Sequence, residues 1–208
     1  MKVLALELST ARASLAWSDD DNCADFQSLE WPNERKDSAL FFENLQKSVR
    51  QFGLPKRIIV GLGPGSYAGV RIAISTAIGL GAAGAELMGC PSVCAIPGQT
   101  SDYAVIGDAR RRSFFFVRIR DRTLAGDYEL LGEAELKKRI EALEPDIPVL
   151  SSDQLPQFEP RVEQRFPSAK ILVELAGETE RNLFRPPLEP IYLRDANVTI
   201  PKPIGMIR

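Results

Sequence analysis

The hydrophobic and polar positions at the start of the chain form short apolar runs separated by turn residues. Val3–Leu8 and Ala13–Trp17 are two such runs, and the polar segment Ser9–Arg12 lies between them. Short apolar runs bounded by turn residues are typical of strands, so this pattern predicts a strand, a tight turn and a second strand. Ala24–Leu29 predicts a third strand after the acidic loop at residues 19–22.

The next segment has the periodicity of a helix. Apolar residues that recur every three or four positions share one helix face, and four do so here: Phe41, Leu45, Val49 and Phe52. Asp37 or Ser38 can cap the amino terminus, because its side-chain oxygen accepts from the open N–H groups of the first turn. Gly53 is a suitable stop. We therefore predict a helix that begins near Ser38 and runs to Gln51.

A buried strand and a second helix complete this part of the chain. Arg57–Leu62 is rich in β-branched residues and predicts a strand, Gly63–Ser66 predicts a turn, and Gly69–Glu86 predicts a helix. The resulting order, β-β-β-α-β-α, is that of a ribonuclease-H-like lobe. We assign this lobe to residues 1–100.

The remainder of the chain repeats the opening pattern. Ala104–Asp108 predicts a strand that ends in an acid, Ala109–Arg112 a turn and Phe114–Arg120 a strand. A helix and two strands are predicted further on, at Glu133–Leu143, Ile147–Leu150 and Ala169–Val173. Prolines mark an extended connector near residue 190, and the tail from Pro201 predicts an irregular terminus. We assign a second, degenerate ribonuclease-H-like lobe with a C-terminal segment to residues 101–208.

The second predicted helix carries an unbroken row of small residues at helical spacing: Gly69, Ala73, Ala77, Gly81 and Ala85. Glycine inside a helix costs about 1 kcal/mol relative to alanine, so close packing should offset it. Small residues let another helix approach, which predicts a subunit interface. Together with Phe41, Leu45 and Val49, this row is our candidate docking surface. The alternative is close packing within the same lobe.

The amino-acid composition excludes several kinds of catalytic and metal site. The 208 residues contain no histidine, which excludes Ser/His/Asp and Cys/His catalysis and every histidine-ligated metal site. Lys and Arg number 26 against 28 Asp and Glu, so the net charge of −2 gives no overall attraction to nucleic acid. The sparse cysteines, Cys23, Cys90 and Cys94, favour the reducing cytoplasm over a secreted disulfide scaffold.

Targeting signals are not evident. The start of the chain lacks the apolar core of a signal peptide, and no stretch approaches the ~20 apolar residues that a spanning helix needs. We therefore expect a soluble, cytoplasmic protein with no membrane partner.

The glycine-rich segment after the fourth predicted strand is the most informative motif. Gly63, Gly65 and Ala68 match the G-x-G-x-x-A dinucleotide fingerprint, but at the wrong strand and without the acid that should follow. No Lys-Ser/Thr pair follows the glycines, so the segment is not a P-loop. A tight turn between strand and helix is the simpler interpretation, although the helix that follows could still offer N–H groups to an anion.

Other candidate side chains have simpler explanations. Glu7 and Asp108 could be acids of an active cleft, but acids at such positions more often cap a turn. Cys90 and Cys94 lack further ligands, so we expect buried thiols and no metal. The three arginines at 110–112 predict a solvated turn, with contact to RNA or an acidic partner as the alternative.

The glycine-rich segment resembles the GPGSFTGLR signature of the TsaB (YeaZ) family. Its matching residues are Gly63, Pro64, Gly65, Ser66, Gly69 and Arg71. Three weaker matches follow the family's order: Leu4–Ser9 resembles LALDTS, Ile106–Arg110 resembles IDAR, and Pro190–Arg194 resembles PxYLR. The chain departs from the family at Glu7 (usually Asp), at Ala68 (usually Thr) and around Lys36 and Asp37, where a histidine is usual.

The resemblance implies an α/β fold of the actin-like ATPase type, with two ribonuclease-H-like lobes and mixed sheets. It implies a non-catalytic scaffold that helps to make N6-threonylcarbamoyladenosine on tRNAs reading codons that begin with A. The scaffold joins a TsaD-like catalytic subunit through its first two helices, and alone it tends to form a homodimer.

The resemblance also bears on ligands. A TsaE-like ATPase would be a further partner, tRNA would be contacted indirectly, and no cofactor would bind tightly. ATP or ADP would bind only at the interface with the catalytic partner. Family members are sometimes labelled peptidase M22 glycoproteases, but this chain has no His-x-x-x-His metal site.

Two functions of other classes remain open. A standalone actin-like ATPase or kinase would need intact phosphate loops in both lobes. A hydrolase using Ser66 would need a base, and no histidine or paired base accompanies that serine.

Overall fold

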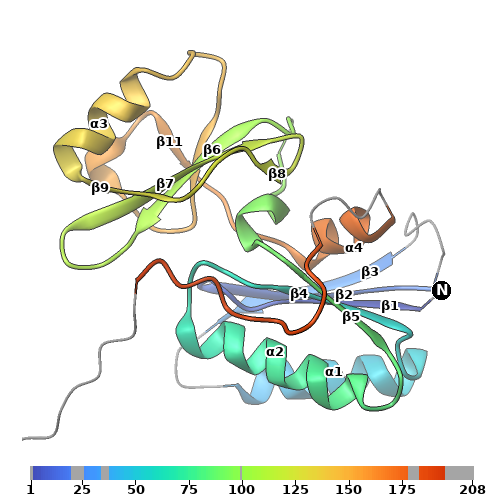
Figure 1. The fold of residues 1–208 in the computed structure, drawn as a ribbon. Helices are drawn as coiled ribbons and strands as arrows, with labels where there is room; N and C mark the ends of the chain where they lie inside the picture. The colour runs from blue at the N-terminus through green and yellow to red at the C-terminus, as the bar shows by residue number, and fades with distance from the viewer. Residues whose placement is uncertain (1, 20–25, 34–37, 99, 178–182, 195–208) are drawn as a thin grey trace, which may run out of the picture.

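A computed structural model describes residues 2–19, 26–33, 38–98, 100–177 and 183–194, and it has two lobes, each built on one sheet (Figure 1). The first sheet has the strand order β3-β2-β1-β4-β5. Because β1 pairs antiparallel with β2 and parallel with β4, the sheet is mixed. Its strands are β1 (Val3–Glu7), β2 (Arg12–Ser18), β3 (Phe26–Pro32), β4 (Arg57–Gly61) and β5 (Glu86–Cys90).

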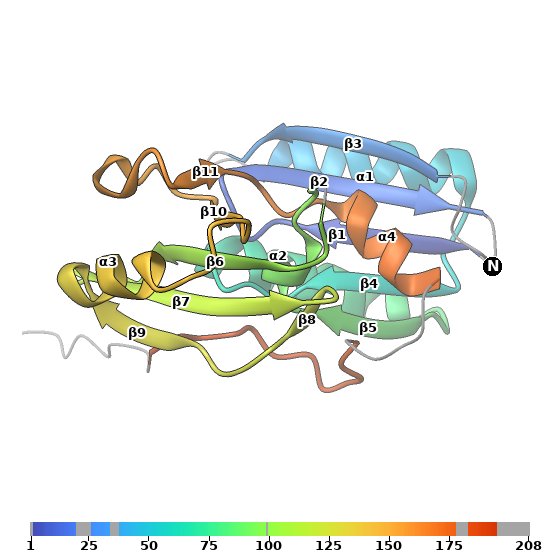
Figure 2. The same cartoon turned by 90° about the horizontal axis from the view of Figure 1, so that it is seen from above.

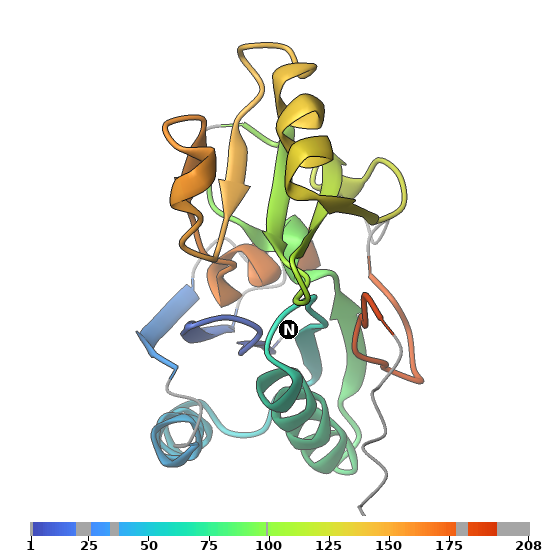
Figure 3. The ribbon, with the colours of Figure 1, turned by 90° about the vertical axis from the view of Figure 1, so that its left-hand side faces the viewer.

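Helices cover both faces of this sheet. Figure 3 shows α1 (Ala39–Phe52) and α2 (Tyr67–Gly81) on one face and α4 (Ala169–Gly177) on the other, toward the second lobe. The alternation of side chains along β1 explains this arrangement. Leu4 and Leu6 pack in the core beneath α1 and α2, whereas Val3 and Ala5 join the core that includes α4 and the second lobe.

The second sheet has the order β11-β10-β6-β7-β8, with β9 also paired to β7. Its strands are β6 (Tyr103–Asp108), β7 (Ser113–Arg120), β8 (Thr123–Leu124), β9 (Glu129–Gly132), β10 (Val149–Ser151) and β11 (Val162–Gln164). Helix α3 (Glu133–Glu141) packs against β7 and β9 (Figure 2). Two 3₁₀ turns, η1 (Ser92–Ala95) and η2 (Pro156–Phe158), follow β5 and β10.

The two sheets share one topology. In both sheets the first strand of the lobe pairs antiparallel with the second strand and parallel with a later strand. That later strand pairs parallel with the last one. The resulting orders are β2-β1-β4-β5 and β7-β6-β10-β11. Where the first lobe has α2, the second has only the short turn η2. This duplication confirms the predicted α/β fold of two ribonuclease-H-like lobes.

Two element predictions were wrong. The second helix ends at Gly81 rather than Glu86, because Gly84, at φ +94, turns the chain into β5, which sequence analysis missed. Residues 169–177 form a helix and not a strand. Both faces of this segment are largely buried, and such a short apolar run has no periodicity that separates strand from helix.

The helix caps also differ from expectation. Ser38 lies at the N-cap of α1, but its side chain makes no capping bond. Ser66 caps α2 instead: its hydroxyl accepts from the Gly69 N–H at 3.2 Å. Asp37, Ala24 and the tail from Pro201 lie outside the described residues.

None of the helices within the described ranges is long and apolar enough to cross a membrane.

Candidate docking surface and signature loop

The signature loop, Gly63–Ser66, connects β4 to α2 and is bonded to the rest of its own lobe. The Ser66 N–H donates to the Ser9 carbonyl oxygen at 2.6 Å, in the turn between β1 and β2. The Gly63 N–H donates to the Ser92 hydroxyl at 2.9 Å. Since these N–H groups have protein acceptors, they are not directed at a phosphate, and the dinucleotide match has a structural origin.

Two glycines allow α2 to begin directly against that turn. A Cβ atom at Gly65 would collide with the carbonyl oxygen of Ser9, and one at Gly69 with the carbonyl oxygen of Leu8. In both cases the obstacle is backbone, which cannot rotate away. Gly65 and Gly69 therefore allow α2 to pack closely against the backbone at the end of β1.

The signature also meets the C-terminal motif, which lies 121 positions further along the chain. Arg71 Nε donates to the Tyr192 hydroxyl at 2.8 Å, and the guanidinium carbon lies 4.0 Å from the ring centre of Tyr67. The Ile191 N–H donates to the Leu62 carbonyl oxygen at 2.8 Å. Together with the contacts of Leu8 and Ser9, this brings together three of the four segments on which the family resemblance rests.

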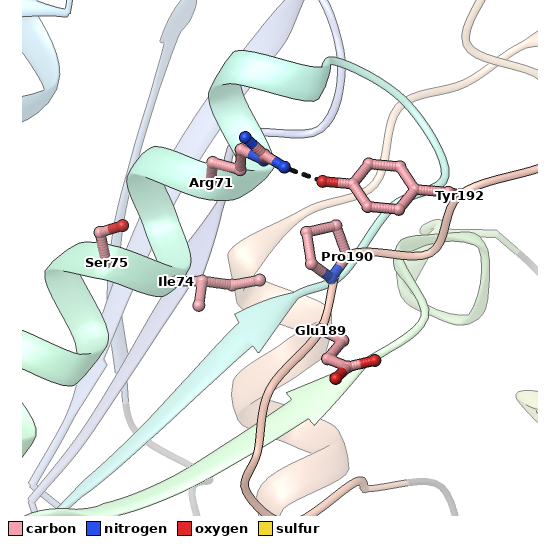
Figure 4. Close-up of a pocket in the computed structure, with 6 residues that line it drawn as sticks. All are labelled: Arg71, Ile74, Ser75, Glu189, Pro190 and Tyr192. Carbon is pink, nitrogen blue, oxygen red and sulfur yellow. Dashed lines mark hydrogen bonds between the residues drawn. The ribbon is translucent and has the colours of Figure 1, made fainter. Parts of the chain in front are cut away.

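A shallow pocket of about 210 Å³ lies at this junction (Figure 4). It is lined by Arg71, Ile74, Ser75, Glu189, Pro190 and Tyr192. Figure 4 shows Arg71 and Ser75 on α2 and the other wall formed by the C-terminal segment. The pocket is therefore part of the surface of α2.

The small-residue row does not lie on the surface, which corrects the expectation that it lines a docking face. Ala73 and Ala77 are fully buried, Gly69 is buried, and a Cβ at Gly81 would press on Leu87 of the adjacent strand. The row lets α2 approach its own sheet, as the alternative interpretation held. Ala85 lies beyond the end of α2, half-buried against the same core.

The apolar residues of α1 that were proposed for docking also pack into the core of the first lobe. Phe41 and Leu45 are buried, and Val49 is half-buried against the same core. Periodicity found this face correctly but could not say that it is the core face.

A different apolar face lies outward. We define the outer helix face as six exposed residues: Tyr67, Ser75, Ile78 and Gly79, which share one side of α2, and Leu40 and Phe42, which flank the buried Phe41 on α1. Ile78 is 55% exposed and Tyr67 53%. Beyond its own stretch of helix, no described atom lies within 4 Å of the place that a Cβ would take at Gly79. The solvent side of α2 carries a single charge, that of the exposed Arg71, which is fewer than is typical of a surface helix.

Glu7 is a fully buried carboxyl group at the end of β1. Its Oε1 accepts from the Ser9 N–H at 2.7 Å, and Oε2 has no hydrogen-bond partner in the described part of the chain. Burial raises the pKa of Glu7 above its ordinary value of 4.5, and the hydrogen bonds from Ser9 oppose this shift. The folded chain thus holds the proton on Glu7 more strongly than the unfolded chain does.

This burial predicts a pH dependence of stability. Below the ordinary pKa, Glu7 is protonated in both the folded and the unfolded chain; as pH rises through the raised folded pKa, the folded chain loses stability. Glu7→Gln, a neutral isostere, should remove this loss, so the variant should gain stability relative to the parent from acidic to alkaline pH. Urea unfolding across this range measures it. A stability difference that does not change with pH would contradict the assignment.

The other candidates from the sequence have structural roles. Asp108 Oδ1 accepts from the Arg110 N–H at 2.7 Å and so caps its turn. Cys90 and Cys94 are buried free thiols. The pKa of Cys90 is raised, chiefly by a hydrogen bond with Cys94 and secondly by burial. Within the described ranges no group of three or more acids and cysteines is placed to hold a metal ion. Cys23 lies outside those ranges.

Solved structures of known proteins share this fold. A solved structure from Pseudomonas aeruginosa, an uncharacterized protein with similarity to the peptidase YeaZ, superimposes with a TM-score of 0.70 at 21% identity, over 93% of this chain and 99% of that one. YeaZ from Pseudomonas aeruginosa gives 0.67 at 20% identity, over 92% and 99%.

Sequence comparisons reach less of the chain. Uncharacterized proteins of Mycobacterium tuberculosis and Mycobacterium bovis are 41% identical over 66 residues, which is 31% of this chain and 31% of each relative. The match thus spans under a third of these relatives. No family model matches.

The topology and the superpositions define the class of the fold: an α/β protein of two lobes, each built on one mixed sheet. Within that class the chain has the fold of YeaZ.

Proposed function

We propose that this chain is a TsaB (YeaZ) protein that acts as a non-catalytic scaffold. In this role it binds a TsaD-like catalytic subunit, which makes N6-threonylcarbamoyladenosine on tRNAs reading codons that begin with A. The docking surface in this proposal is the outer helix face, not the inward row of small residues.

The observation that carries the proposal is the outer helix face itself. α2 turns Ile78 and Gly79 outward, with open space at Gly79. α1 adds Leu40 and Phe42, which are 40% and 48% exposed. Large apolar side chains beside a position without a side chain allow close helix packing. Two helices of a partner can thus complete a four-helix bundle.

The signature loop supports a scaffold rather than an ATPase. Its Gly63 and Ser66 N–H groups already have acceptors within the lobe, so they cannot also cradle a phosphate. In the proposal ATP or ADP binds only at the interface with the partner, tRNA is held chiefly by the partner, and a TsaE-like ATPase joins the assembly. The same face supports a homodimer when the partner is absent. Reduced, buried Cys90 and Cys94 suit the cytoplasm.

Co-expression with the TsaD-like protein of the same organism tests the proposal. The two chains should elute together from a size-exclusion column, and the isolated chain should show no ATPase, peptidase or transferase turnover. Separate elution, or turnover that survives further purification of the isolated chain, would contradict it.

A further inference from the structure

Three consecutive arginines, Arg110, Arg111 and Arg112, form the turn between β6 and β7 in the second lobe, and all three are exposed. The Ser113 N–H donates to the Arg110 carbonyl oxygen at 3.1 Å, which places Arg111 and Arg112 at the two central positions of the turn. Figure 1 shows this hairpin end beside the described end of the C-terminal segment.

The backbone of the turn is unusual for arginine. The φ angles of the three residues are 66°, 55° and 57°, all in the left-handed region. Two-residue turns of this hand strongly favour Asn-Gly or Asp-Gly, because other side chains crowd the backbone. The fold alone therefore favours other residues here. An outlier of this kind points to a role of the side chains themselves.

Most of the positive charge of this turn is not paired with a carboxylate of the described residues. Arg110 pairs with Asp108 at 3.0 Å, and the second nearby carboxylate, Asp153, accepts from the Asp108 N–H. Arg111 and Arg112 have no carboxylate partner among the described residues. Arg194 joins them from the C-terminal segment through a hydrogen bond to the Ser113 hydroxyl.

We propose that this arginine turn, Arg110–Arg112 with Arg194, binds the sugar–phosphate backbone of an RNA. Planar guanidinium groups match phosphate oxygens in charge and in bidentate geometry. The centre of a protein interface is instead depleted of charge and rich in large apolar side chains, and residues 108–113 expose none of these. The inference rests on the proposed function for its choice of RNA over DNA.

The test uses the full chain and a labelled, unmodified tRNA transcript, with affinity measured at several salt concentrations. Arg111→Asn with Arg112→Gly removes two charges and supplies the residues that this turn prefers, so the melting temperature should rise. RNA binding should weaken, and the slope of log K against log salt should become shallower by about 1 per arginine lost.

A matched control removes the same charge elsewhere. Lys56→Ala with Arg120→Ala changes two exposed cations, one in the first lobe and one at the far end of β7. Its slope should stay near that of the parent. An equal loss in both variants, an unchanged affinity of the turn variant, or equally tight binding of poly-glutamate would each overturn the proposal. The turn variant should still elute with the TsaD-like protein, so failure of the scaffold role is detected separately.

Discussion

Replacing Gly79 with leucine should weaken binding of the TsaD-like partner by roughly five- to 150-fold while the chain remains folded. The added side chain enters open space in the isolated chain but fills the seam of the proposed bundle. Overpacking of this kind costs about 1–3 kcal/mol, which at ~1.4 kcal/mol per tenfold gives the stated range. Leucine is also the better helix former, so the melting temperature should not fall. Calorimetric titration and thermal unfolding measure the two effects.

Ala77→Leu is the matched control on the inner side of the same helix. Ala77 is fully buried, so the same added volume must enter the core of the lobe. This variant should melt at a lower temperature, and its folded fraction should bind the partner normally. The reverse pattern, with Gly79→Leu binding normally and Ala77→Leu losing affinity without loss of stability, would place the interface on the small-residue row.

Gly69→Ala should destabilise the chain more than any single methyl group placed on the outer face. The new Cβ would collide with the Leu8 carbonyl oxygen, and that backbone cannot move without disturbing β1. We expect a loss of about 1–3 kcal/mol, or roughly 2–12 °C in melting temperature at about 2–4 °C per kcal/mol for a chain of this size.

Gly79→Ala is the control for this prediction. It makes the same substitution in the same helix, at a position where the described residues outside the adjoining helix backbone leave the new Cβ free of contacts within 4 Å. Its stability should rise by about 1 kcal/mol, the helix-propensity difference between the two residues. Equal responses of Gly69 and Gly79 to alanine would show that the contact with Leu8 does not constrain the helix.

The elements that were predicted well from the sequence have a hydrophobic pattern that fits only one type of secondary structure. The β1–β2 hairpin, α1 and β4 were found close to their observed bounds because apolar runs and turn residues agree there. β5 was missed because Gly81 and the alanines after it extend a helical pattern past the true end of α2. Residues 169–177 were misassigned because burial on both faces removes the period.

The site was less accessible to sequence analysis. Periodicity identified the row of small residues on α2, but the opposite side also contains small and apolar residues, so the pattern could not tell the core face from the solvent face. The contact of Arg71 with Tyr192 joins distant segments and has no local signal beyond the two motifs. The signature glycines, by contrast, were recognisable, and the structure adds the reason: backbone oxygens of Leu8 and Ser9 lie against them.

Reconstituted threonylcarbamoylation of tRNA tests the central claim most directly. The TsaD-like protein, a TsaE-like ATPase, the activated threonylcarbamoyl donor and tRNA are combined with the parent chain, with Gly79→Leu, or with no added chain. The scaffold account predicts modification with the parent chain, little without it, and a rate with Gly79→Leu that recovers only at much higher concentrations of the variant. Full modification without the chain, or an unchanged concentration dependence with Gly79→Leu, would contradict it.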